Sequence, residues 1–113
     1  MITPTKLEAL DLTLSVIAEL ADVRDAIRRK DRNLADQLTR AATSVALNLS
    51  EANGSDPGNK RARLHTALGS ARETRTALHI AAAWRYIDVD IATHLDAQLD
   101  RICAMTWRLI RRT

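Results

Sequence analysis

Helix-breaking residues are concentrated in one short stretch of this 113-residue chain, ANGSDPGN at residues 52–59. The stretch holds two of the three glycines and one of the two prolines, and its Asn-Gly, Asp-Pro and Pro-Gly steps are typical of turns. Because chain breakers are rare elsewhere, long helices are favoured over many short strands. We therefore expect an all-α protein.

Apolar residues outside this turn recur every three or four positions, the spacing of one helix face. They predict helices over about Pro4–Lys30, Asn33–Glu51 and Asn59–Trp84, and a fourth from Asp88 or Asp90 to the C-terminus. Thr3 or Thr5 can cap the first helix, and Asp88 or Asp90 the fourth. Short connections imply antiparallel neighbours. The expected fold is a single domain over residues 1–113, an antiparallel up-down-up-down four-helix bundle.

The first predicted helix carries two apolar stripes, which make its apolar face wider than one neighbouring helix requires. One stripe contains Leu7, Leu10, Leu14, Ile17 and Ala21, and the other Leu12, Val16, Leu20, Val23 and Ile27. A chain of this length also has a thin core as a monomer. Both observations predict that the surplus apolar face is covered by another protein chain, either a further copy or a different partner.

Asn48 occupies a position of the second helix where the spacing predicts an apolar residue. A buried amide without partners costs about 1–3 kcal/mol, so we expect a polar network around it that fixes helix register. Folding the second and third helices about Ser55 predicts an Arg40–Glu73 ion pair, and lets Gly69 allow close helix approach. The predicted network is Arg40, Ser44, Asn48, Glu51, Ser70 and Glu73. Alternatively, Asn48 merely helps to end its helix.

Basic residues gather at both ends of the predicted bundle, and most are arginines, which bind phosphate as a two-pronged fork. One group is Arg24, Arg28, Arg29, Lys30 and Arg32; the other, our candidate RNA-binding set, is Lys60, Arg61, Arg63, Arg108, Arg111 and Arg112. With a net charge of only +3, these groups also fit solvated helix ends. The spacing of Trp84, Tyr86 and Trp107 predicts no stacking platform, so any RNA binding should be led by the backbone, with weak sequence specificity.

Enzyme chemistry is not predicted. His65, His79 and His94 have no metal-ligand spacing, and the single Cys103 excludes an intrachain disulfide or a cysteine-based zinc cluster. Arg72 and His79 have a spacing that some helical ribonucleases use, but they lie about two turns apart. We expect no catalytic residues, cofactor, metal or small-molecule substrate, and a packed Cys103 thiol.

Membrane insertion and export are not predicted either. No apolar run approaches the ~20 residues that a membrane-spanning helix needs, and MITPTKLEALDL lacks a signal-peptide core. The expected location is the cytoplasm of a bacterium.

Two stretches, QLTRAATSVALNLSEANG (37–54) and LHTALGSARETRTAL (64–78), resemble the four-helix-bundle family of 23S ribosomal-RNA intervening-sequence proteins. The positions that carry the resemblance are Gln37, Leu38, Arg40, Ala41, Ser44, Asn48 and Glu51, then Ala67, Gly69, Ser70 and Glu73. The chain departs from the family's Glu-Gly step, which is Glu51-Ala52 here. The family name describes where some members are encoded, within insertions in ribosomal RNA genes.

The resemblance implies more than the residues alone predict. Family structures are homopentamers, and a protein similar in fold, the accessory variability determinant of diversity-generating retroelements, binds RNA and a reverse transcriptase through a basic pentameric surface. The implied function is a non-enzymatic, oligomeric accessory protein that binds RNA through basic surfaces, with a reverse transcriptase as a further partner. The alternative is a protein-interaction scaffold without a nucleic-acid role.

Overall fold

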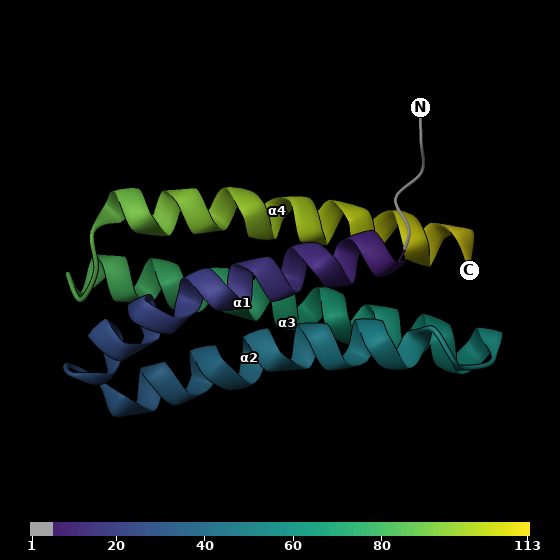
Figure 1. Cartoon of the computed structure of the whole chain (residues 1–113), viewed down its shortest axis with the longest axis horizontal. Helices are drawn as coiled ribbons and strands as arrows, with labels where there is room; N and C mark the ends of the chain where they lie inside the picture. Colours follow the sequence, from purple (N-terminus) through teal and green to yellow (C-terminus); the bar gives the residue numbers. More distant parts are fainter. Residues whose placement is uncertain (1–5) are drawn as a thin grey trace.

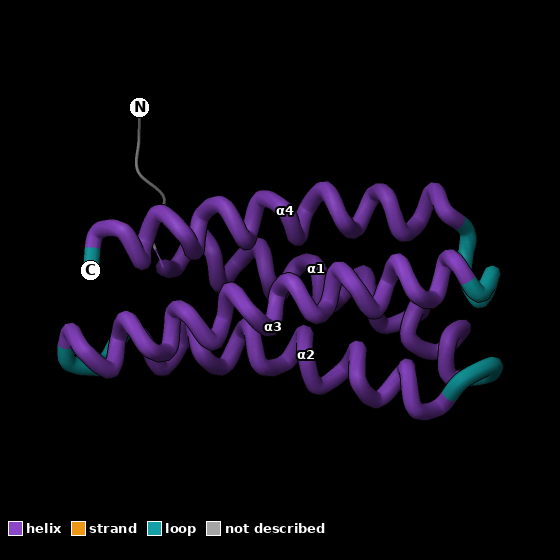
Figure 2. Tube along the Cα trace, turned by 180° about the vertical axis from the view of Figure 1, so that it is seen from behind, coloured by secondary structure: helices purple, strands orange, loops and turns teal. Residues whose placement is uncertain are grey.

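The computed structural model describes residues 6–113, which are 88% helical and contain no strand. The four helices are α1 (Lys6–Arg28), α2 (Arg32–Ala52), α3 (Pro57–Ala83) and α4 (Val89–Arg112). Helices that follow one another in the chain run antiparallel, and the bundle is about 42 Å long. Figure 1 and Figure 2 show it from opposite sides, with the connecting turns at its two ends. The predicted all-α, up-down-up-down four-helix bundle is confirmed.

The helix starts follow capping chemistry. Asp31 accepts a hydrogen bond from the backbone N–H of Leu34, and Asp56 accepts one from Asn59, each at 3.0 Å. Pro57 follows Asp56 at the first helical position, where a missing N–H costs nothing, so α3 begins two residues before the predicted start. Asp88 is the N-cap residue of α4, but its side chain makes no capping bond. The capping predicted for Thr3 or Thr5 lies outside the described residues.

The core is built from aliphatic side chains and alanine, and all four helices contribute to it. Its largest fully buried residues include Ile27, Leu49, Leu78 and Ile102. The stripe of α1 that begins at Leu7 is covered only in part: Leu10 and Ile17 pack partly buried against the core, whereas the exposed fraction of Leu7 is 65% and that of Leu14 is 50%. The single chain therefore leaves uncovered part of the apolar face for which the sequence predicted a partner.

The turn between α3 and α4 contains an arginine in an unusual conformation. Arg85 has φ 64°, the one non-glycine residue with positive φ in the described part of the chain. Its N–H donates to the Ala82 carbonyl, and the Tyr86 N–H to the Ala81 carbonyl. These two bonds form a Schellman motif, in which glycine usually takes the left-handed position. A residue with a side chain costs roughly 1–2 kcal/mol there.

Candidate nucleic-acid interface

The six predicted RNA-binding residues lie at one end of the bundle, which we call the basic end. The α2–α3 turn and the last turn of α4 meet there (Figure 1). A guanidinium of α3 joins them, because Arg61 Nη1 donates a hydrogen bond to the Ile110 carbonyl at 3.0 Å. The basic end is defined by Lys60, Arg61, Arg63, Arg108, Arg111 and Arg112.

Most of these cations have no acidic partner. Arg63 pairs with Glu51 across α2 and α3 at 2.8 Å; within residues 6–113 the other five form no ion pair. Arg111 and Arg112 lie in the last turn of α4, where the helix dipole favours cations, whereas Lys60 and Arg61 lie in the unfavourable first turns of α3. The nearby Asp56 is engaged in capping, and its bond from the Asn59 N–H lowers the pKa of its carboxyl. The basic end therefore presents an excess of free cations.

The opposite end holds the α1–α2 and α3–α4 turns, and we call it the aromatic end because Trp84 and Tyr86 lie there. Its cations are interleaved with acids. Arg24 pairs with Asp25 at 3.2 Å, and Arg28 with Asp36 at 3.3 Å. The predicted basic group that begins at Arg24 thus shares its surface with carboxylates, which offset part of its charge.

Trp84 and Tyr86 form a stacked pair, with ring centroids 6.5 Å apart and planes inclined by 17°. The sequence argument, which found no stacking arrangement among Trp84, Tyr86 and Trp107, missed this pair. Residues two apart point in different directions on a helix, but the left-handed Arg85 between them turns the chain and brings the rings together. Trp107 lies alone on α4, next to Arg108.

The predicted polar network around Asn48 is present only in its central part. Asn48 Nδ2 donates to the Ser44 carbonyl and to Ser44 Oγ, and Ser44 Oγ lies 2.8 Å from Ser70 Oγ on α3. The predicted Arg40–Glu73 ion pair is absent from the described residues. Both side chains are exposed, where an ion pair gains little. Whether the network fixes register stays a prediction.

Two further predictions about this face are corrected. The Glu51 carboxylate pairs with Arg63 and makes no hydrogen bond to Ser44 or Ser70 among the described residues, so it lies outside the Asn48 cluster. A Cβ added at Gly69 would meet nothing within 4 Å, so Gly69 does not serve a close approach between α2 and α3. The predicted close contact was wrong because Gly69 faces solvent.

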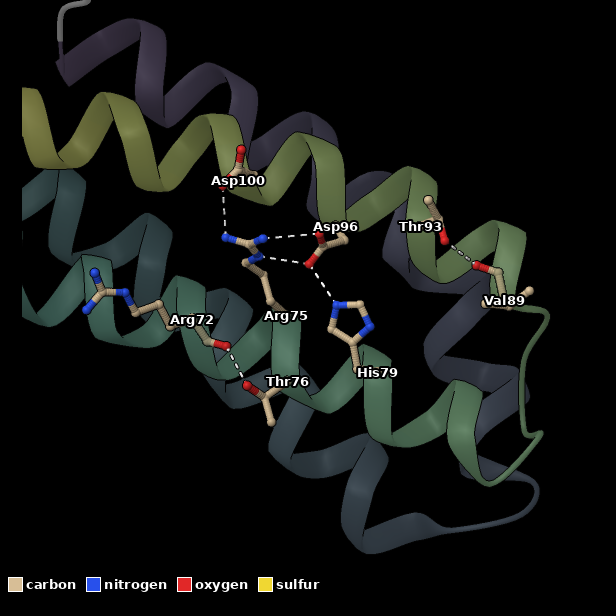
Figure 3. Close-up of polar contacts among 8 residues, drawn as sticks. All are labelled: Arg72, Arg75, Thr76, His79, Val89, Thr93, Asp96 and Asp100. Carbon is tan, nitrogen blue, oxygen red and sulfur yellow. Dashed lines mark hydrogen bonds and ion pairs between the residues drawn. The ribbon is translucent and has the colours of Figure 1, made fainter.

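Sequence reasoning missed a polar cluster between α3 and α4 (Figure 3). Arg75 binds both carboxylate oxygens of Asp96, at 2.8 and 3.1 Å, and reaches Asp100 at 3.1 Å. His79 Nε2 lies 2.9 Å from Asp96 Oδ1. The Arg75 hydrogen bonds lower the pKa of the Asp96 carboxyl. The repeat of acids four residues apart on α4, opposite a basic pair four apart on α3, is the signal that could have found it.

This cluster does not have the geometry of a nuclease site. Arg72 points away from His79 (Figure 3), and the imidazole is already engaged with Asp96. Cys103 is buried as predicted, which raises the pKa of its thiol. In the part of the chain described, no three His, Cys, Asp or Glu residues are grouped to hold a metal.

The comparisons with known proteins concern the family and the fold. Residues 5–108 match the family model described as 23S rRNA-intervening sequence protein. The chain belongs to this family. The fold is shared with a crystal structure from Bacteroides thetaiotaomicron VPI-5482, described as a protein of unknown function from the S23 ribosomal protein family. The TM-score is 0.84 at 19% identity, over 90% of this chain and 97% of that one.

Two negative findings complete the description of this family member. No curated protein matches the sequence. Among the residues described, no helix is long and apolar enough to cross a membrane.

Proposed function

We propose that this chain is a non-enzymatic accessory protein that binds RNA through the basic end and acts as a homo-oligomer, a homopentamer by family resemblance. The observation that carries the proposal is the excess there of cations that have no acidic partner in the described part of the chain. Arg108, Arg111 and Arg112 are exposed at the end of α4 without an ion pair in residues 6–113. A guanidinium group without a carboxylate partner can bind phosphate through two parallel hydrogen bonds.

The expected binding is led by the RNA backbone. Cations that neutralise phosphates release counterions, so affinity should fall steeply with salt. Phosphate contacts carry no sequence information, which accounts for weak sequence specificity. Several copies in one ring would add their contacts and raise the avidity.

Self-association would use the apolar surface of α1 and α2. Two surface hollows share Thr39 and Thr43 as lining residues. Ile17 lines one of them, and Leu47, with an exposed fraction of 57%, lines the other. Leu14 lies one turn before Ile17. These leucines form a surface suited to cover by another copy.

The test is size-exclusion chromatography with light scattering, recorded at protein and nucleic-acid wavelengths, at low salt and with added RNA. We expect a particle of about five protomers that takes up RNA and releases it at high salt. The variant R108E/R111E/R112E should lose RNA, whereas R72E/R101E, with charge reversals at exposed side positions outside both hollows, should keep it. Equal loss in both variants would contradict a site at the basic end.

The second candidate function is a protein-interaction scaffold, favoured by the exposed Leu14 and Leu47. Each leucine is replaced by cysteine in a Cys103→Ala background, and its reaction with a thiol label is measured. A particle that takes up no RNA and whose introduced cysteines react with the label would support the scaffold. A reverse transcriptase partner, implied by the resemblance, is tested by co-purification with and without R108E/R111E/R112E. The cytoplasmic location belongs to the same proposal.

A further inference from the structure

We infer that the aromatic end binds unpaired bases of single-stranded RNA, with Trp84 as the stacking surface and Arg85 as a phosphate contact. This goes beyond the proposed function, because it assigns a second site at the opposite end of the bundle with a different chemistry. The basic end would bind any phosphate backbone, whereas this site requires an exposed base.

Arg85 is the first part of the argument. It occupies the left-handed position of a Schellman motif, where glycine would carry no steric penalty. Its side chain is exposed and forms no hydrogen bond or ion pair in the described part of the chain. The fold of the single chain therefore gains nothing from this guanidinium. Strained residues of this kind cluster at functional sites, and a free guanidinium there suits a phosphate.

Trp84 supplies the stacking surface. Its exposed fraction of 68% is the highest among the large apolar side chains that the structure describes. One side of the indole is backed by Tyr86, whose hydroxyl donates to Asp31 Oδ2 at 3.4 Å. Because Asp31 also caps α2, the ring pair is tied to the helix framework. Base stacking on such a ring tolerates any base.

Further cations lie on the turn that the ring pair contacts. The Tyr86–Asp31 contact joins the α3–α4 turn to the α1–α2 turn, and Figure 1 shows the two turns at the same end. The exposed Arg29, Lys30 and Arg32 flank Asp31 and form no ion pair within residues 6–113. An RNA strand that stacks a base on Trp84 would have these cations beside its phosphates.

Two further acids of this end, Asp22 and Asp88, lie beside Tyr86 and Arg85. An open cavity of about 660 Å³ between α1 and the start of α4 is lined by Tyr86, Arg85, Asp22 and Asp88, but not by Trp84. Its carboxylates disfavour phosphate, and Asp90 in the first turn of α4 adds to this. Because Arg85 lines this cavity and is the chain neighbour of Trp84, the inferred phosphate path reaches its guanidinium from the Trp84 side and continues over the α1–α2 turn.

The two tryptophans make the test direct, because Trp84 and Trp107 report on opposite ends of the bundle. W107F leaves Trp84 as the sole tryptophan, and W84F leaves Trp107, so excitation selective for tryptophan reads one end at a time. In W107F we expect quenching by short oligouridine, much weaker quenching by duplex RNA of the same length, and none by inorganic polyphosphate. Removing the ring with W84A should weaken oligouridine binding, measured by anisotropy of labelled RNA, by about 5- to 150-fold.

Arg85 is tested in the same W107F background. R85G relieves the backbone strain, so it should fold at least as well yet bind oligouridine several-fold more weakly. R85K keeps the charge and should keep most of the affinity. R72A removes a guanidinium from the side of α3 and is the matched control for loss of charge.

Three results would overturn the inference: equal quenching of Trp84 by polyphosphate or duplex RNA, equal quenching by uridine monophosphate at the same base concentration, or unchanged affinity in R85G. If no nucleic acid changes the Trp84 fluorescence, the inference is wrong, and a protein becomes the expected partner of this site. The R108E/R111E/R112E change in W107F separates the two proposals. If it leaves the Trp84 signal intact, this site stands independently of the basic end.

Discussion

The two ends of the bundle carry similar sets of cations, but their surroundings differ. At the basic end one arginine, Arg63, is ion-paired in the described residues, and the other five cations form no ion pair there. At the aromatic end Arg24 and Arg28 are paired with acids, and a tryptophan stacked on Tyr86 lies at the same end. The comparison teaches that pairing and neighbouring rings, more than the number of cations, determine which part of an RNA each end would recognise.

The largest expected effect is on the affinity for polyphosphate, a polyanion without bases, and it should differ between the two ends. R108E/R111E/R112E should lower polyphosphate affinity about a hundredfold at 0.1 M salt and the salt slope by about two units, if each residue contacts one phosphate. R29E/K30E/R32E should lower it far less, because nearby acids already weaken that surface. Calorimetric titration with polyphosphate, which detects binding at either end, measures both losses. Equal losses would remove the distinction between the ends.

The Arg75–Asp96 cluster lies away from both ends and provides a reference point. D96N leaves Arg75 and His79 without their shared carboxylate, and should lower the free energy of unfolding by about 1–3 kcal/mol. RNA binding at either end should not change. Urea unfolding and RNA titration measure the two properties separately, and a D96N variant of full stability would show that the cluster contributes little.

The same cluster predicts an acid dependence. Because Arg75 lowers the pKa of Asp96 in the folded protein, its contribution to stability is fully present above the unfolded value of about 3.9. It is lost as pH falls through the lower folded pKa. Between pH 7 and pH 3, wild type should therefore lose more stability than D96N. Parallel pH profiles would contradict the role assigned to this carboxylate.

One arginine at each end should respond to mutation with opposite sign. At the basic end, R61A removes the hydrogen bond to the Ile110 carbonyl and should lower stability by roughly 1 kcal/mol, since a partly exposed charged bond falls at the low end of its range. Thermal unfolding measures the change. R61K keeps the charge but not the planar fork, so it should lie between R61A and wild type.

At the aromatic end, R85G should raise stability by roughly 1 kcal/mol. It removes left-handed strain of about 1–2 kcal/mol, and the greater freedom of unfolded glycine offsets part of the gain. This corresponds to an increase in Tm of roughly 4 °C for a domain of this size. A lower Tm would mean that the Arg85 side chain stabilises the fold and would remove the reason to assign it a ligand.

Periodicity was enough to predict the helices and their order, because apolar spacing and turn residues are local properties. It also placed Arg61 near the end of α4, because short connections determine which helix ends meet. Periodicity could not predict the Trp84–Tyr86 stack. The stack depends on a left-handed backbone at position 85, and an arginine there does not indicate that conformation. The Arg75–Asp96 contact and the absent Arg40–Glu73 pair depend on how each helix is rotated about its axis, which spacing alone does not determine.

The smallest expected effect concerns Gly69, midway between the two ends. Alanine there meets nothing within 4 Å, so G69A should stabilise the helix by roughly 0.5–1 kcal/mol, measured by urea unfolding at low protein concentration. If the isolated chain were the functional form, G69A would change neither RNA binding nor the oligomeric state. If an assembled neighbour packs closely on this face of α3, the same methyl group should weaken oligomerisation while it strengthens the protomer. Light scattering of G69A and G69S decides between these outcomes. If a neighbouring protomer packs on this face, the larger serine side chain should weaken oligomerisation more than alanine does. If position 69 faces solvent in the assembly, neither variant should change the oligomeric state.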